Sequence, residues 1–85
     1  MPYIQPEQRE LLEGYAPMVL GERCVGPGEL NYLLTRVIQG YLFRNRGYRG
    51  INDAIGALEC CKLEMYRRVA SPYEDQKIQE NGDVY

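Results

Sequence analysis

The stretch PGELNYLLTRVIQGYLF, residues 27–43, decides the fold class because it has the pattern of one long helix. Pro27 suits a first helical position, and Glu29 favours the positive N-terminal end of the helix dipole. The opposite side carries polar residues, whereas the apolar residues form a stripe wider than one contact face needs. The stripe consists of Leu30, Leu33, Leu34, Val37, Ile38, Tyr41 and Leu42. Its width predicts burial against two neighbours.

A first helix is predicted before this stretch, over residues 6–20. Pro6 suits its first position. Pro17 has no amide hydrogen and crowds the preceding turn, so this helix should kink or break near Glu13 to Gly14.

Two helices are predicted after it, over residues 51–70 and 72–80. The helix of residues 51–70 has its own apolar stripe, made of Ile51, Ala54, Ile55, Leu58, Cys61, Met65 and Val69. We expect it to stop before Pro72, because a residue that precedes proline is pushed out of the helical region. Ser71 and Glu74 then have the spacing of a capping box for the last helix.

These segments predict one all-α domain over residues 1–85: a small bundle of three main helices plus a short C-terminal helix. No segment alternates with the period of a strand. A chain of 85 residues has a small core and gains stability from a partner or ligand. Since the first helix is too short to cover two wide apolar stripes, we expect a homo-oligomer.

Cysteine and histidine usage limits the possible chemistry. The three cysteines, two of them adjacent, make a poor disulfide framework and a poor zinc site. We therefore expect the cysteines to be small, buried apolar residues of the core, and we expect no metal or cofactor. Histidine, the commonest general base, is absent, and no carboxylate pair shares a helix face. We therefore expect no catalytic residues and no enzyme. No signal peptide and no membrane span are predicted, which favours the cytoplasm, and that of the host if a phage encodes the chain.

Charge is unevenly distributed along the chain. Residues 1–22 carry four acidic side chains and one basic, residues 23–70 carry four acidic and eight basic, and residues 71–85 carry four acidic and one basic. A basic middle between acidic ends can be self-complementary between subunits. The formal net charge of -2 argues against nucleic acid as the partner.

The basic cluster YLFRNRGYRG, residues 41–50, is the candidate site. Arginine binds phosphate in a bidentate manner and tyrosine can stack on a base. The candidate residues are Tyr41, Arg44, Arg46, Tyr48 and Arg49, with Arg67 and Arg68 added across a subunit boundary. A plainer interpretation is that Arg44 and Arg46 only stabilise the C-terminal end of a helix before Gly47 reverses the chain. Both interpretations stay open, and Tyr48 with Arg49 is the pair that the plainer one does not explain.

The segments PGELNYLLT, IGALECCKLEMYRRV and SPYEDQKIQENGDVY resemble a family of small proteins of undescribed function from bacteriophages and some bacteria. Its members begin near MPYI and end in NGDVY, and FRNRGYRG fits the pattern least clearly. The resemblance implies a phage-type accessory protein and assigns no role to any residue. The function that we expect is interaction, as a helical oligomer, with a host or phage protein. The alternative is binding of a small anionic ligand, such as a linear or cyclic nucleotide, at subunit boundaries.

Overall fold

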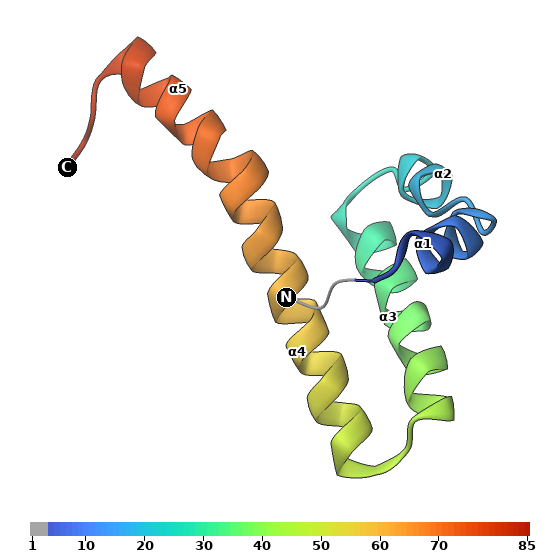
Figure 1. Ribbon diagram of the computed structural model, residues 1–85. Coiled ribbons are helices and arrows are strands. Elements are labelled where there is room, and N and C mark those ends of the chain that lie inside the picture. Colours follow the sequence, from blue (N-terminus) through green and yellow to red (C-terminus); the bar gives the residue numbers. More distant parts are fainter. Residues whose placement is uncertain (1–3) are drawn as a thin grey trace. The chain divides into compact units, whose positions relative to one another are not determined.

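The computed structural model describes residues 4–85, and the elements in that range are all helical (Figure 1). Residues 1–3, which begin the MPYI motif, lie outside it. The chain divides into two units, one ending at Ala54 and the other beginning at Ile55. The elements are α1 (Pro6–Glu13), α2 (Pro17–Glu22), α3 (Pro27–Arg44), α4 (Gly47–Met65), a π-helical turn (Tyr66–Ala70) and α5 (Ser71–Asn81). The all-α prediction is confirmed for the described residues.

The predicted break in the first helix separates α1 from α2. A helix continued into residue 17 would place the proline ring against the carbonyl of Glu13, and α1 ends at that residue. Ala16 then has a left-handed backbone, with φ at 52°, before Pro17 begins α2. The helix predicted over residues 6–20 is therefore two short helices.

Helix α3 matches the predicted stretch and extends one residue further, to Arg44. At its start, the Glu29 carboxylate accepts a hydrogen bond of 3.0 Å from the backbone amide of Val25. At its end, the backbone and side-chain amides of Asn45 both donate to the carbonyl of Tyr41, at 2.9 and 3.0 Å. Asn45 thus satisfies a carbonyl that the end of the helix would otherwise leave unpaired.

The turn between α3 and α4 is shorter than the sequence predicts, because α4 begins at Gly47 and not at residue 51. Gly47 has φ at 86°, which lets the chain reverse within two residues. Gly50 then lies against the preceding turn: a Cβ atom there would stand 1.7 Å from the Asn45 carbonyl oxygen. The tight reversal leaves room for four more helical residues.

The predicted stop before Pro72 is wrong. Ser71 is helical, with φ at -62° and ψ at -47°, and its amide donates to the carbonyl of Tyr66, five residues earlier. In a regular α-helix the proline ring would crowd the carbonyl of Arg68, and the wider π-helical turn relieves that conflict without ending the helix. Ser71 therefore makes no cap, and the predicted capping box with Glu74 does not form.

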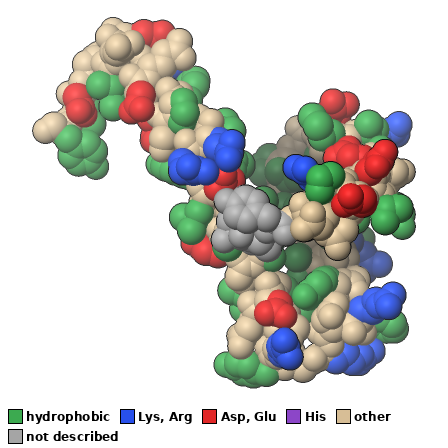
Figure 2. All heavy atoms as spheres, viewed as in Figure 1, with side chains coloured by type: hydrophobic (Ala, Val, Ile, Leu, Met, Phe, Trp, Pro, Cys, Tyr) green, Lys and Arg blue, Asp and Glu red, His purple; other side chains and the backbone are tan. Residues whose placement is uncertain are grey.

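Apolar side chains are mostly exposed in both units (Figure 2). Among the described residues, Ala54, at 5% exposure, is the one buried hydrophobic residue. In α3 the side chains of Leu33, Ile38 and Leu42 are half-buried, and the rest of the predicted stripe is exposed. The predicted burial of the two stripes is therefore not found within either unit. No helix in the described range has the length and apolar character needed to cross a membrane.

Candidate functional site

Five of the predicted site residues meet at the corner where α3 ends and α4 begins, in the first unit. Tyr41 and Arg44 belong to the last turn of α3, and Arg46 lies in the connection. The first turn of α4 carries Tyr48 and Arg49, which corrects the expectation that this pair follows the helix end in a loop. Figure 2 shows basic side chains gathered at this end of α3.

Arg46 stabilises the end of α3. Its Nε atom donates a hydrogen bond of 3.2 Å to the carbonyl of Phe43. Its guanidinium carbon also lies 5.0 Å from the centre of the Phe43 ring, within cation–π range. These contacts agree with the plainer interpretation of this arginine, since they satisfy a carbonyl at the negative end of the helix dipole.

Arg44 and Arg49 differ from Arg46, because in residues 4–85 neither side chain forms a hydrogen bond, an ion pair or a ring contact, whereas Arg46 contacts Phe43. Arg49 lines a hollow of about 350 Å³ together with Asn45, Arg46, Gly50 and Asp53. The hollow thus combines two guanidinium groups with one carboxylate, so its charge is mixed but positive on balance.

The two tyrosines of the corner are both accessible. Tyr48 is 78% exposed and Tyr41 is 42% exposed. A ring with so much free surface can stack on a planar ligand or pack against another protein.

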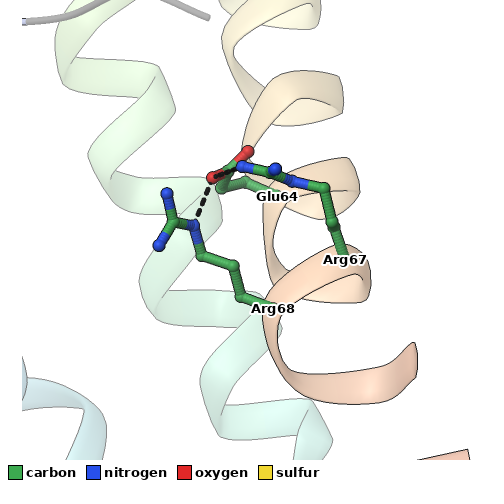
Figure 3. Close-up of polar contacts among 3 residues, drawn as sticks. All are labelled: Glu64, Arg67 and Arg68. Carbon is green, nitrogen blue, oxygen red and sulfur yellow. Dashed lines mark hydrogen bonds and ion pairs between the residues drawn. The ribbon is translucent and has the colours of Figure 1, made fainter. Parts of the chain in front are cut away.

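Arg67 and Arg68 lie in the second unit, on the π-helical turn, and both bind the carboxylate of Glu64 (Figure 3). The Arg67 Nη2 atom is 2.7 Å from Glu64 Oε1, and Arg68 donates to the same oxygen. The Arg68 hydrogen bond, followed by that of Arg67, lowers the pKa of Glu64 below its ordinary value of 4.5. One carboxylate facing two guanidinium groups leaves one positive charge in excess.

Tyr66 connects the two sides of the π-helical turn. Its hydroxyl donates a hydrogen bond of 3.3 Å to the carboxylate of Glu74. This hydrogen bond holds the proton on the phenol and, with the nearby negative charge, raises the pKa of Tyr66 above 10.0. The Glu74 carboxylate therefore binds a side chain of the π-helical turn and does not take part in the predicted cap.

The three cysteines are all free thiols. Cys24 and Cys60 are half-buried, and the Cys24 thiol donates to the carbonyl of Leu20 at 3.5 Å. Cys61 is exposed, which corrects its expected place in a buried stripe. The described residues contain no cluster of three side chains able to hold a metal ion.

Sequence reasoning missed Gly50 and Asn45, which set the geometry of the corner. The available signal was the spacing of Gly47 and Gly50, because a glycine near a helix start indicates a close backbone approach as well as a turn. Asn45 carried a weaker signal, since asparagine favours helix ends and turns.

A second hollow of about 440 Å³ lies in the first unit, between the two short helices and α3. Its lining is mainly apolar: Ile4, Arg9, Leu12, Glu13, Tyr15, Pro17, Leu20 and Val37. Such a groove is suited to an apolar side chain of another molecule and offers few groups to an anion.

A family model described as "Domain of unknown function (DUF6899)" matches residues 1–84. Comparison with curated proteins and with solved structures found no match. The family match covers both units, and its description assigns no chemistry to the corner residues.

Proposed function

We propose that this chain, which belongs to the DUF6899 family, is a non-enzymatic accessory protein of phage type. It assembles with copies of itself and presents the resulting helical surface to a host or phage protein. The observation that supports this proposal is the exposure of nearly all large apolar side chains, with Ala54 as the one buried hydrophobic residue in the described range.

The energetic argument concerns the helices themselves. Amphipathic helices in proteins gain most of their stability from packing an apolar face, and isolated short helices are marginal in water. Burial of one large apolar side chain contributes about 1.5–3 kcal/mol to the stability of the protein relative to full exposure of that side chain. Leu11, Leu12 and Leu34 alone are 75%, 54% and 46% exposed, so contact with further chains offers a large gain. A homo-oligomer supplies that contact with surface that every copy already carries.

Sedimentation velocity and native mass spectrometry test the assembly. At micromolar concentration the proposal expects a discrete oligomer with a mass that is a multiple of the 9.8 kDa chain. A monomer that keeps full helicity under the same conditions would overturn it.

A second candidate function is the binding of a small anionic ligand of nucleotide type at the α3–α4 corner. Its support is that Arg44 and Arg49 lack carboxylate partners in the described range and that Tyr48 is highly exposed. Arginine and an exposed aromatic ring together fit a phosphate and a base.

Thermal shift across a panel of linear and cyclic nucleotides tests this second candidate. A ligand at 100 times its dissociation constant adds about 2.7 kcal/mol of stability. Arg49→Ala should remove the shift. Arg36→Ala should keep it, since Arg36 lies elsewhere on α3 and donates to Gln39. A flat panel, or equal loss in both variants, would reject the corner as the ligand site.

A further inference from the structure

The second unit contains a helical seam that no other part of that unit covers. The seam starts with Ile55, Leu58, Lys62, Met65, Val69 and Tyr73, spaced three or four residues apart, as on one face of a helix. It runs without a break across the π-helical turn, because Met65, Ala70 and Ser71 all keep helical backbone angles. Met65 is 58% exposed and Val69 is 64% exposed. Two charged residues, Lys77 and Glu80, continue the same spacing toward the end of α5.

Charge is arranged along this seam with opposite signs at its two ends. Lys62 lies nine residues before Ser71, and Glu80 lies nine residues after it. The surrounding helix follows the same pattern: residues 55–70 carry three basic and two acidic side chains, and residues 71–83 carry one basic and four acidic. Two copies of the seam that run in opposite directions therefore bring unlike charges together.

We propose that two copies pair through this seam in an antiparallel arrangement, with the two-fold axis beside Ser71. The inference rests on the proposed function, because it names the surface through which self-assembly occurs. In this register, Lys62 of one copy lies opposite Glu80 of the second copy, and the symmetry repeats the pair. At the centre, Val69 of each copy lies opposite Tyr73 of the other, which forms an apolar middle.

The charges also select the direction of the pairing. In a parallel pair, Lys62 would face Lys62 and Glu80 would face Glu80, and like charges at facing positions oppose association. Among the described residues, Lys62 pairs with Glu59 at 3.1 Å, and Glu80 contacts Lys77 at 3.3 Å and accepts a hydrogen bond of 3.4 Å from Gln76; all of these contacts are exposed. Exposed pairs of this kind contribute little stability, so both side chains can turn to a second copy at small cost.

Met65 and Lys77 fit the same register. Met65 lies opposite Lys77 of the second copy, and the aliphatic stem of that lysine can cover the thioether while its ammonium group stays in water. Lys77 already lies over an aromatic ring, since its Nζ atom is 5.5 Å from the centre of Tyr73. Pairing thus covers Met65, Val69 and Tyr73, whereas Ile55 and Leu58 lie beyond the helical part of the second copy in this register.

Charge reversal tests the register, with self-association of the full chain measured by analytical ultracentrifugation at low salt. Lys62→Glu and Glu80→Lys should each weaken the pairing step roughly tenfold, because two attractive contacts become repulsive. The double variant should restore wild-type association, since it exchanges the charges without losing the pair. Asp75→Lys is the matched control for Glu80→Lys, because it makes the same charge change on α5 but away from the seam. It should have little effect on self-association.

Cysteine crosslinking gives a second readout, on a chain with Cys24, Cys60 and Cys61 replaced by alanine. Met65→Cys mixed with Lys77→Cys should form a disulfide-linked heterodimer on mild oxidation. Met65→Cys alone should not crosslink, because twelve helical residues separate positions 65 and 77 and the two Met65 sites lie about 18 Å apart along the axis. Crosslinking of Met65→Cys with itself would instead indicate the parallel pairing and overturn the proposal.

The outcomes separate this inference from the proposed function. A monomeric wild-type chain would reject both. An oligomer whose association is unchanged by Lys62→Glu and Glu80→Lys, or is weakened further in the double variant, would reject the seam and keep self-assembly.

Discussion

Gly50 is the residue on which the corner between α3 and α4 depends. A Cβ atom at this position would overlap the Asn45 carbonyl, which belongs to the backbone and has no rotamer with which to move away. We expect Gly50→Ala to lower the free energy of unfolding by about 1–3 kcal/mol through overpacking. Urea denaturation followed by circular dichroism at a fixed chain concentration measures the change.

Gly40→Ala is the control for that prediction. Gly40 lies inside α3, where an added Cβ atom would meet no other atom within 4 Å. Alanine is the better helix former, so this variant should be more stable by about 0.5–1 kcal/mol. If the free energy of unfolding changes in the same direction in both variants, the close approach between Gly50 and Asn45 does not determine the stability of the corner.

Ala16 carries backbone strain at the boundary between α1 and α2. A left-handed conformation costs an alanine about 1–2 kcal/mol, whereas glycine adopts it freely. Glycine also adds roughly 0.4–1 kcal/mol of conformational entropy to the unfolded chain, so Ala16→Gly should be neutral or up to about 1.6 kcal/mol more stable. Ala16→Val should be clearly less stable, because a β-branched side chain suits this conformation even less. Thermal melts of the three proteins decide the order, and a clearly destabilised Ala16→Gly would contradict it.

At the scale of a helix, the pairing of Glu64 with two arginines makes the second unit sensitive to acid. The pKa of Glu64 is lowered in the folded state, first by Arg68 and then by Arg67. Its contribution to stability is therefore fully present above the ordinary value of 4.5 and is lost as the pH falls through the lowered value. Urea melts of wild type and Glu64→Gln should differ at pH 7 and converge in strong acid. A difference in unfolding free energy that grows as the pH falls would contradict this prediction.

The hydrogen bond between Tyr66 and Glu74 reports on the π-helical turn. In a regular α-helix, side chains eight residues apart point about 80° away from each other, so this contact needs the extra width of the turn. The phenol is neutral when it donates, and this stabilisation is present below pH 10.0 and is lost as the pH rises through the raised pKa of Tyr66. Titration of the tyrosines by NMR should show the pKa of Tyr66 returning toward 10.0 in Glu74→Ala and unchanged in Asp75→Ala. No response to Glu74→Ala would contradict the geometry of the turn.

At the scale of the whole molecule, assembly should make stability depend on concentration. If copies cover one another's apolar faces, the assembled state is favoured by mass action, and the melting temperature should rise steadily from about 1 to 100 µM chain. Differential scanning calorimetry over this range measures the dependence. A melting temperature that does not change with concentration would indicate that each chain is stable alone.

The helices could be predicted well from the sequence, and their junctions could not. Pro6 and Pro27 gave two helix starts and Pro17 gave the break after α1, because a missing amide hydrogen acts locally. The predicted helix end before Pro72 was wrong for the same reason. The local rule favours a break at proline, but a π-helical turn relieves the same steric conflict. The early start of α4 depends on Gly50 meeting Asn45, a contact between backbone atoms that no periodicity reveals. For the candidate site, the residues near the corner were predictable, whereas the different contacts of Arg46 and Arg49 required coordinates.

The short corner at Asn45 and Gly47 also sets an order of events in time. Its contacts join residues that are close in sequence, so helix formation and closure of the turn should take about a microsecond. Association of two chains at about 1 µM, with a typical rate constant of 10⁵–10⁷ M⁻¹s⁻¹, takes roughly 0.1–10 s. If copies associate as proposed, a newly made chain would therefore spend its first moments solitary, with marginally stable helices whose apolar faces are open to any neighbour. The yield of correctly assembled protein should then depend on how fast it is synthesised relative to how fast copies meet.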